Sequence, residues 1–387
     1  MTSQHKRTQH ERRQDGTTQH RTNLPGPTAP DVASAASITD ALTALGWDAG
    51  WQSAAAAHPA TADPTRPTGT TRPGRVARTD RGRCLVRTAG GEVHADLLPG
   101  LDPEPTTGDW VLVDEQDHLL AVLPRRTALV RGAGGSDTRA QVLAANLDVV
   151  FIVVPLSSAP NLSRLERMLG LAWSSGARPV VLLSKADLAR TAAAERDQVA
   201  EAAPGADVLL VSTMDGTGLD ELASLLPAGT TGALLGVSGA GKSSLVNALV
   251  GSDLLAVDRL AAVGKGKHTS VARELVGLPS RALLIDTPGL RGVQMWDTEE
   301  GLGQTFTDVV AFTESCRFSD CGHDTEPGCA VTAALADGSL SHRRWDSYRK
   351  LLREQTWLAG RYDARLRAEQ RAGWKRRQAE GRSGRRR

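Results

Sequence analysis

The stretch from Gly236 to Ser243 constrains this chain more than any other feature of its 387 residues. It reads Gly-Val-Ser-Gly-Ala-Gly-Lys-Ser and fits the pattern G-x-x-x-x-G-K-[ST]. An apolar segment that predicts a strand, Ala233–Val237, precedes it, and a predicted helix begins at Lys242. Such a loop turns backbone N–H groups around phosphate oxygens, which the helix N-terminus also attracts. A chance glycine-rich turn is the alternative, but the strand-loop-helix context favours a phosphate-binding loop, called the P-loop below.

The region around the P-loop alternates between apolar strands and helices, beginning near Asn146. Apolar strands separated by helices predict a parallel sheet that is covered on both faces, and ligands of such sheets bind at the carboxyl ends of the strands. The other predicted strands are Leu147–Pro155, Pro179–Leu183, Asp207–Val211 and Arg281–Ile285, and the other predicted helices are Leu162 to about Ser175, Ala189–Ala203 and Leu219–Leu226.

Motifs at three other strand ends favour GTP over ATP. Asp286-Thr-Pro-Gly289 follows one strand, where GTPases place residues that sense magnesium and the γ-phosphate. Ser184-Lys185-Ala-Asp187 follows another, and a carboxylate there can accept both N1–H and N2–H₂ of guanine, which adenine lacks. Ser212-Thr213 resembles the loop that contacts the guanine O6.

The residues before this region indicate an extension and a small barrel. Residues 1 to about 35 lack apolar periodicity, which is typical of disorder, and Ile38–Trp51 predicts one short helix whose Leu42, Leu45 and Trp47 could dock on a neighbouring domain. From about Gly74, five short alternating runs favour an OB-type barrel. These runs are Arg75–Arg78, Arg83–Arg87, Val93–Leu97, Asp109–Val113 and His118–Val122.

Charge is distributed unevenly. Residues 341–387 hold sixteen basic against five acidic residues, whereas residues 31–340 hold 25 against 37. A solvated helix from Arg343 to about Arg371 with a ragged end is one interpretation, and an arm that contacts RNA phosphates is the other. No apolar run approaches the ~18–20 residues that a membrane helix needs. The polar N-terminus and four cysteines give neither a secretory signal nor a disulfide framework, so we expect a cytoplasmic protein.

Three of the four cysteines cluster with a histidine. Cys316, Cys321, His323 and Cys329 supply three thiolates and one imidazole within fourteen residues, a set that completes a tetrahedral zinc shell. Because no position would stay open for catalysis, we expect one structural zinc per chain. Reduced surface thiols are the alternative, which the clustering disfavours. The fourth cysteine, Cys84, is expected to pack inside the barrel.

The motifs occur in an unusual order, since the guanine motif (184–187) and its companion (212–213) precede the P-loop. The sheet must therefore be circularly permuted. Together with the barrel, this permutation resembles the small ribosomal subunit-dependent GTPase A family (RsgA, also called YjeQ). Gly108-Asp109-Trp110, Ala144-Ala145-Asn146-Leu147-Asp148, Lys267-His268-Thr269-Ser270 and the cysteine region also match, so that the resemblance covers about residues 72–357.

The resemblance implies the roles of individual residues. Lys242 and His268 would be catalytic, although His268 could equally be a solvated loop histidine. Magnesium would be bound by Ser243, Thr269 and Asp286, and zinc by the cysteine cluster. The residues expected to bind GTP are Ser184, Lys185, Asp187, Ser212, Thr213, Gly236, Val237, Ser238, Gly239, Ala240, Gly241, Lys242, Ser243, Ser244, Asp286 and Gly289.

Two positions depart from the usual GTPase pattern. Ser184 replaces the Asn of the guanine motif and cannot make the same amide contacts to the base and the P-loop. Leu290 stands where many GTPases carry a water-orienting Gln, in agreement with the family pattern. It predicts slow intrinsic hydrolysis unless another group positions the water.

The expected fold is a multidomain α/β protein with an N-terminal OB-like β-barrel, a circularly permuted P-loop GTPase domain with a parallel sheet, and a C-terminal zinc-binding helical domain. The expected domains are 1–70 (mostly disordered, with one short helix), 71–130 (barrel), 140–295 (GTPase) and 296–387 (zinc-binding domain with basic tail).

The expected function is GTP hydrolysis in late maturation of the small (30S) ribosomal subunit through rRNA binding, slow alone and stimulated by the subunit. Expected partners are that subunit, its rRNA and GTP or GDP, with no membrane. A monomer is expected, although the sequence leaves the oligomeric state open. The alternative is a nucleotide-gated RNA-binding module with little hydrolysis; a small-molecule P-loop kinase is disfavoured by Asp286–Gly289 and Ser184–Asp187.

Overall fold

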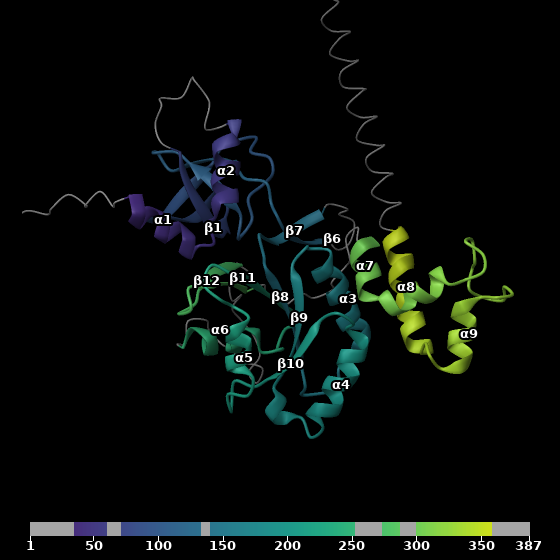
Figure 1. Cartoon of the computed structure of the whole chain (residues 1–387). Helices are drawn as coiled ribbons and strands as arrows, with labels where there is room; N and C mark the ends of the chain where they lie inside the picture. The colour runs from purple at the N-terminus through teal and green to yellow at the C-terminus, as the bar shows by residue number, and fades with distance from the viewer. Residues whose placement is uncertain (1–34, 60–70, 133–139, 252–272, 287–298, 358–387) are drawn as a thin grey trace, which may run out of the picture. The chain divides into compact units, whose positions relative to one another are not determined.

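The computed structural model describes residues 35–59, 71–132, 140–251, 273–286 and 299–357. Its first part is a closed five-stranded barrel, with strand order β1-β2-β3-β5-β4 (Figure 1). Each of the five predicted runs is a strand, which confirms the OB-like barrel. The strands are β1 (Arg72–Asp80), β2 (Arg83–Thr88), β3 (Gly91–Leu97), β4 (Trp110–Val113) and β5 (His118–Val122). Cys84 is fully buried inside the barrel.

Two helices, not the single predicted one, precede the barrel: α1 (Ala35–Ala44) and α2 (Ala49–Ala57). The chain breaks because Gly46 adopts a left-handed φ of +86° and Asp48 caps α2 by accepting a hydrogen bond from Trp51 N at 2.9 Å. Trp47 and Trp51 then pack on the buried Trp110 of the barrel. Leu42 is buried in the same cluster and Leu45 packs against it, which confirms the predicted docking of Leu42, Leu45 and Trp47 on a neighbouring domain.

A two-stranded antiparallel ribbon, β6 (Ala128–Gly132) and β7 (Ala140–Ala145), follows the barrel and was not predicted. The chain then enters a six-stranded sheet of order β10-β9-β8-β11-β13-β12. Its strands are β8 (Val149–Pro155), β9 (Arg178–Ser184), β10 (Asp207–Val211), β11 (Thr231–Gly236), β12 (Glu274–Gly277) and β13 (Leu283–Asp286).

All neighbours in this sheet are parallel except β12, which pairs antiparallel with β13. Strands β8 and β11 are buried almost throughout, as expected for a sheet covered on both faces. One face packs against α3 (Leu162–Trp173) and α4 (Ala192–Ala202), and the other against α5 (Leu219–Ser224) and α6 (Lys242–Val250), as Figure 1 shows. The P-loop strand β11 lies inside the sheet although three of its strands precede it in the chain, which is the permuted arrangement.

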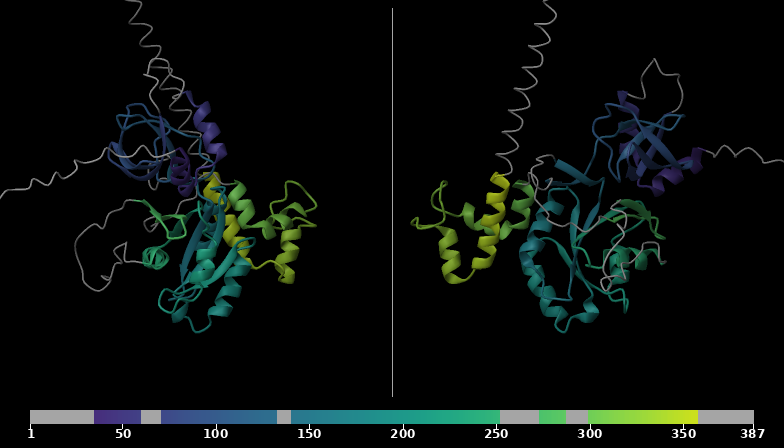
Figure 2. Two further views of the ribbon diagram at one scale, coloured as in Figure 1. Left: turned by 60° about the vertical axis from the view of Figure 1, so that its left-hand side comes forward. Right: turned by 180° about the vertical axis from the view of Figure 1, so that it is seen from behind.

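The C-terminal region is helical (Figure 2). It contains α7 (Glu299–Thr305), α8 (Thr307–Glu314), α9 (Ala330–Asp337) and a further helix whose described part covers 342–357, called the C-terminal helix below. These elements share a separate apolar core around Phe306, Val309 and Trp345. Across the described ranges, no helix combines the length and apolar character needed to cross a bilayer.

Candidate functional site

The P-loop connects the end of β11 to the start of α6. Gly239 and Gly241 have φ of +78° and +91°, a left-handed conformation that side chains rarely tolerate. At Gly236 the constraint is different, because an added Cβ would lie 2.7 Å from the Val153 carbonyl oxygen of the neighbouring strand. Gly239 and Gly241 thus allow the tight turn of the loop, and Gly236 allows the close approach of the loop to strand β8. Of the remaining loop residues, Ala240 is buried, Val237, Ser243 and Ser244 are half-buried, and Ser238 is exposed.

Lys242 lies inside the loop. Its Nζ donates hydrogen bonds to the carbonyl oxygens of Gly236 (3.0 Å) and Val237 (3.1 Å), and the residue is buried. Burial lowers the pKa of this ammonium group, while the nearby carboxylate of Asp286 acts in the opposite direction. A cation held in this way beside turned-in backbone amides is suited to the outer phosphates of a nucleotide.

Asp286 ends strand β13 beside the P-loop. Burial raises the pKa of its carboxyl group, opposed by Lys242 and by a hydrogen bond with Ser243. Its Oδ1 is buried and has no hydrogen-bond partner among the described residues. An unsatisfied carboxylate oxygen near a hydroxyl provides the hard oxygen donors that magnesium prefers, so these residues fit a magnesium ion bound with a nucleotide.

The second half of the site lies at the carboxyl ends of β9 and β10. The Ser184 hydroxyl donates to the carbonyl oxygen of Ala240 at 2.7 Å, and Lys185 Nζ donates to that of Gly239 at 2.8 Å. The guanine motif is therefore tied directly to the P-loop. Ser184 lacks the amide of Asn, yet its shorter hydroxyl still contacts this loop.

Asp187 is exposed at the same edge and accepts a hydrogen bond from the buried Ser212 hydroxyl at 2.7 Å. Ser212 Oγ in turn accepts from Met214 N at 3.1 Å, which orients the hydroxyl toward the carboxylate. Thr213 is exposed beside it. This arrangement leaves a positioned, solvent-facing carboxylate that can accept hydrogen bonds from a base.

Four predicted residues lie outside the described parts of the chain: His268, Thr269, Gly289 and Leu290. Their roles stay predictions.

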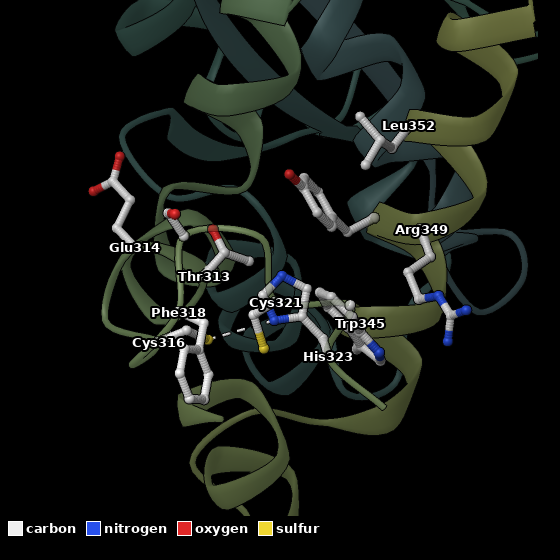
Figure 3. A pocket seen from close by; sticks show the side chains of 12 residues that line it. Thr313, Glu314, Cys316, Phe318, Cys321, His323, Trp345, Arg349 and Leu352 are labelled. Carbon is white, nitrogen blue, oxygen red and sulfur yellow. Dashed lines mark hydrogen bonds between the residues drawn. The ribbon is translucent and has the colours of Figure 1, made fainter. Parts of the chain in front are cut away.

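The cysteine cluster is assembled between α8 and α9. Cys316 Sγ lies 3.4 Å from His323 Nδ1 and 4.0 Å from Cys329 Sγ, and all four ligand atoms lie within 4.8 Å of one another (Figure 3). His323 adopts a φ of +58°, and its ring meets Trp345 edge-on at 5.5 Å. This spacing and donor chemistry fit a tetrahedral zinc ion. The cluster forms one wall of a cavity of about 580 Å³ that Tyr348 and Leu352 of the C-terminal helix also line.

Sequence reasoning missed the contacts that attach the C-terminal domain to the sheet. Arg344 lies in the helix that is expected to be solvated or to contact RNA, but it is buried and binds the fully buried Glu166 of α3 at 2.8 Å. Arg343 also binds Glu166, at 3.0 Å. These two arginines therefore belong to a contact between domains. The detectable signal was the acidic residue on the otherwise apolar face of the predicted helix 162–175.

Known proteins share this sequence and fold. A family model described as RsgA GTPase matches residues 122–296. The chain is 47% identical over 361 residues to a protein of Streptomyces avermitilis named small ribosomal subunit biogenesis GTPase RsgA, covering 90% of this chain and 95% of that protein. A Streptomyces coelicolor protein of the same name is 46% identical, with 89% and 94% covered.

Solved structures are similar as well. The crystal structure of YjeQ from Thermotoga maritima matches with a TM-score of 0.56 at 24% identity, covering 74% of this chain and 98% of that one. YloQ, described as a circularly permuted GTPase, matches with a TM-score of 0.53 at 25% identity, covering 76% and 96%. Both likenesses extend beyond the matched GTPase region to most of the chain.

Proposed function

This chain belongs to the RsgA GTPase family and is a GTP hydrolase, and we propose that it acts in late maturation of the small ribosomal subunit. The reaction is hydrolysis of GTP to GDP and phosphate. The observation that carries the proposal is the direct contact between the two halves of the site, through Ser184 to Ala240 and Lys185 to Gly239. One continuous site can thus hold phosphates at one end and read a guanine at the other.

The proposed phosphate end consists of the P-loop amides and Lys242. Its loop N–H groups and buried ammonium are fixed before the nucleotide arrives, so they stabilise charge on the transferred group with little reorganisation. Asp286 and Ser243 would hold magnesium together with Thr269, which lies outside the described residues. The bound ion would neutralise part of the phosphate charge. His268 is the proposed water-positioning group, because Leu290 cannot orient water.

The proposed base end is Asp187, oriented by Ser212. Replacing Asp187 by Asn should weaken GTP binding and improve binding of xanthosine triphosphate, because the amide complements the altered purine edge. The measurement is competition between the two nucleotides for the wild type and the variant. An unchanged preference for GTP would show that Asp187 does not face the base.

We further propose that the relevant partner is the small subunit with its rRNA, bound by a monomeric chain in the cytoplasm. The names of the relatives support the subunit, and the fourteen basic residues that remain between 341 and 387 once the Glu166-bound Arg343 and Arg344 are set aside support the RNA contact. GTP turnover should rise as purified small subunits are titrated in, and Lys242→Ala should abolish turnover at every subunit concentration. Equal turnover with and without subunits would contradict this partner.

The proposed metal of the C-terminal domain is one structural zinc bound by Cys316, Cys321, His323 and Cys329. The mutual distances of the four ligand atoms, together with a donor set that would fill all four positions of a tetrahedral ion, support a structural role. Elemental analysis of freshly purified protein should give one zinc per chain, and a value near zero would overturn the assignment.

A further inference from the structure

The barrel contributes one tight turn, Thr106–Asp109, to the edge of the sheet that carries Asp286. Thr107 is almost completely buried, and its hydroxyl donates to the carbonyl oxygen of Arg273 at 3.2 Å. Gly108 has a φ of +93°, and a Cβ there would collide with the Ala145 carbonyl oxygen and lie 3.1 Å from Ile285 Cδ1. The turn therefore lies against Ala145 of β7 on one side, and against Arg273 before β12 and Ile285 of β13 on the other.

The two contacted residues have a particular place in the sheet. Arg273 directly precedes Glu274, Ile285 directly precedes Asp286, and Glu274 and Asp286 are register partners across β12 and β13. The turn therefore lies next to the two residues, Arg273 and Ile285, that directly precede the register pair Glu274 and Asp286. Because Ile285 is fully buried and its Cδ1 adjoins Gly108, a shift of the turn is expected to act on the end of β13.

The turn is itself held rigidly. Asp109 is fully buried, accepts a hydrogen bond from Thr106 N at 2.7 Å and binds Arg125 through both oxygens, at 2.7 and 2.8 Å. The Thr107 carbonyl oxygen accepts from Ala145 N at 3.0 Å. Bidentate, charge-assisted bonds of this kind fix geometry as well as add stability.

The Gly108 carbonyl oxygen accepts hydrogen bonds from Arg75 Nε (3.2 Å) and Asn146 Nδ2 (3.1 Å). Arg75 comes from strand β1 of the barrel, and Asn146 from the junction that leads into β8. Barrel, junction and turn are therefore connected by buried hydrogen bonds, and the Thr107 hydroxyl extends this network to Arg273, the residue before β12.

We propose that the Thr106–Asp109 turn is a positioning element for Asp286, and that the Thr107 hydroxyl is its positioning contact. The inference rests on the proposed GTP site, because it assigns Asp286 to the phosphate end. Asp286 lies beside Lys242, so its misplacement affects a ligand with outer phosphate charge more than a diphosphate.

The test uses the full-length protein and compares Thr107→Val with Thr106→Val. The first substitution removes the hydroxyl bonded to Arg273, and the second removes a neighbouring buried hydroxyl that bonds to Val142 of β7 at 3.4 Å. Affinities for GDP and for a non-hydrolysable GTP analogue are measured with magnesium. Thr107→Val should lower the affinity for the analogue about 3- to 10-fold, the range that one net hydrogen bond corresponds to, and change GDP less than about twofold.

Thr106→Val should leave both affinities within about twofold of the wild type. Thr107→Ser keeps the donor and should restore the analogue affinity, which a purely steric role would not require. Equal losses for GDP and the analogue in Thr107→Val, or no change in either, would overturn the positioning role.

The wild type separates this inference from the function beneath it. If the wild-type protein fails to bind or hydrolyse GTP, the proposed function is wrong and the positioning role is wrong with it. If the wild type binds and hydrolyses GTP while Thr107→Val has the same ratio of the two affinities, only the positioning role is wrong.

Discussion

The barrel and the C-terminal domain are both attached to the GTPase sheet, but by different chemistry and at different places. The barrel is joined at the β12–β13 edge, through an apolar core that includes Ala77 of the barrel and Ile285 of the sheet. The C-terminal domain is joined at α3, through buried charges centred on Glu166. One attachment adjoins the proposed phosphate sensor, whereas the other contacts a helix on one face of the sheet.

The barrel attachment relies on hydrogen bonds from Arg75 to backbone carbonyl oxygens. The guanidinium of Arg75 is buried and donates to three carbonyl oxygens, those of Leu45 (2.5 Å), Gly108 (3.2 Å) and Asn146 (2.8 Å). Burial lowers the pKa of Arg75 to about 10, which still leaves it charged at neutral pH. These hydrogen bonds fix the Gly108 turn relative to strand β1 and to the junction before β8. A displacement of one of these three parts should therefore displace the others.

The C-terminal attachment is an ion network. Arg344 binds Glu166 of α3 and Asp308 of α8, donates to the Thr305 carbonyl oxygen at 2.7 Å, and lies over the Phe306 ring at 4.3 Å. Although burial opposes its charge, the hydrogen bonds with Asp308 and Glu166 raise the pKa of Arg344. The single guanidinium of Arg344 thus bonds to α3, α7 and α8, and attaches the C-terminal domain to α3.

This difference indicates that the two joints have different tasks. We infer that the barrel joint links the barrel to the nucleotide site, and that the C-terminal joint holds the domain with the proposed zinc site in a fixed place. Changes at the C-terminal joint should then alter stability without altering nucleotide preference, and changes at the barrel joint should alter both.

Loss of zinc should give the largest effect. Cys321→Ser, or chelation of the wild type, should remove the metal and leave residues about 310–335 unprotected in hydrogen exchange, because structural zinc contributes its binding energy to local folding. GTP affinity should stay within about twofold, since the P-loop belongs to a separate core. Cys84→Ala, which removes a buried thiol from the barrel, is the control that should retain one zinc per chain. A parallel loss of zinc and GTP binding would contradict the separation.

Glu166→Ala should give the next largest effect. It leaves Arg344 buried without one of its carboxylates, and breaking such a pair costs about 3–5 kcal/mol in the free energy of unfolding. Chemical denaturation, combined with hydrogen exchange at α3 and the C-terminal helix, measures this loss.

The matched control is Glu354→Ala, whose partner Arg167 also lies on α3 but is partly exposed, so about 1 kcal/mol or less is expected. Neither variant should change the ratio of GDP to GTP-analogue affinity. If Glu166→Ala shifts that ratio as strongly as Thr107→Val, the C-terminal joint also communicates with the nucleotide, and the comparison is wrong.

Arg75→Met tests the barrel joint from its centre. Leaving buried carbonyl oxygens without a donor should cost about 1–3 kcal/mol and should also reduce preference for the GTP analogue, because the Gly108 turn loses a support. Arg72→Met, on the same strand, removes a half-exposed guanidinium that binds Asp114 and Asp117 within the barrel, and it should leave nucleotide preference unchanged. If Arg75→Met loses stability but keeps the wild-type preference for the GTP analogue over GDP, the barrel joint has a structural role alone.

The sequence predicted best those features that a few consecutive residues specify. The P-loop turn and the Cys316–Cys329 cluster each need only one short segment, whose spacing already fixes the geometry. The proximity of the guanine motif to the P-loop also follows from the sequence, because parallel strands end at the same edge.

Features made by residues far apart in the chain could not be predicted. Arg344 and Glu166 are separated by 178 positions, and an arginine in a basic helix gives no sign that it is buried. Strand β12 was not predicted either, because its two buried residues, Leu275 and Val276, do not make the longer apolar run that marks the inner strands. The same holds for Thr107, whose partner Arg273 is 166 positions away. The barrel's strands were predictable, but its joint to the sheet was not.

Lowering the pH is expected to give the smallest effect, through the Asp48–Arg126 pair on the outer side of the barrel joint. Asp48 binds Arg126 with both oxygens, at 2.6 and 2.7 Å, and caps α2, whose Trp51 packs on Trp110. The hydrogen bond with Arg126 lowers the pKa of Asp48 to about 2. Because the folded pKa lies below the unfolded value of about 3.9, this stabilisation is complete above about pH 5 and is lost as the pH falls from there through about 2.

The effect should be modest and sensitive to salt, since Asp48 and Arg126 are half-exposed. Hydrogen exchange in α2 between pH 5 and pH 2 measures it, as the difference between the wild type and Asp48→Asn. Asn keeps the helix cap but cannot lose a proton, so the difference should shrink steadily from pH 5 and be only a small remainder at pH 2. Leu45, between α1 and α2, supplies a carbonyl acceptor to Arg75, so loosening these helices should weaken the barrel joint slightly. A difference that stays constant across this pH range would show that the Asp48–Arg126 pair does not stabilise this side of the joint.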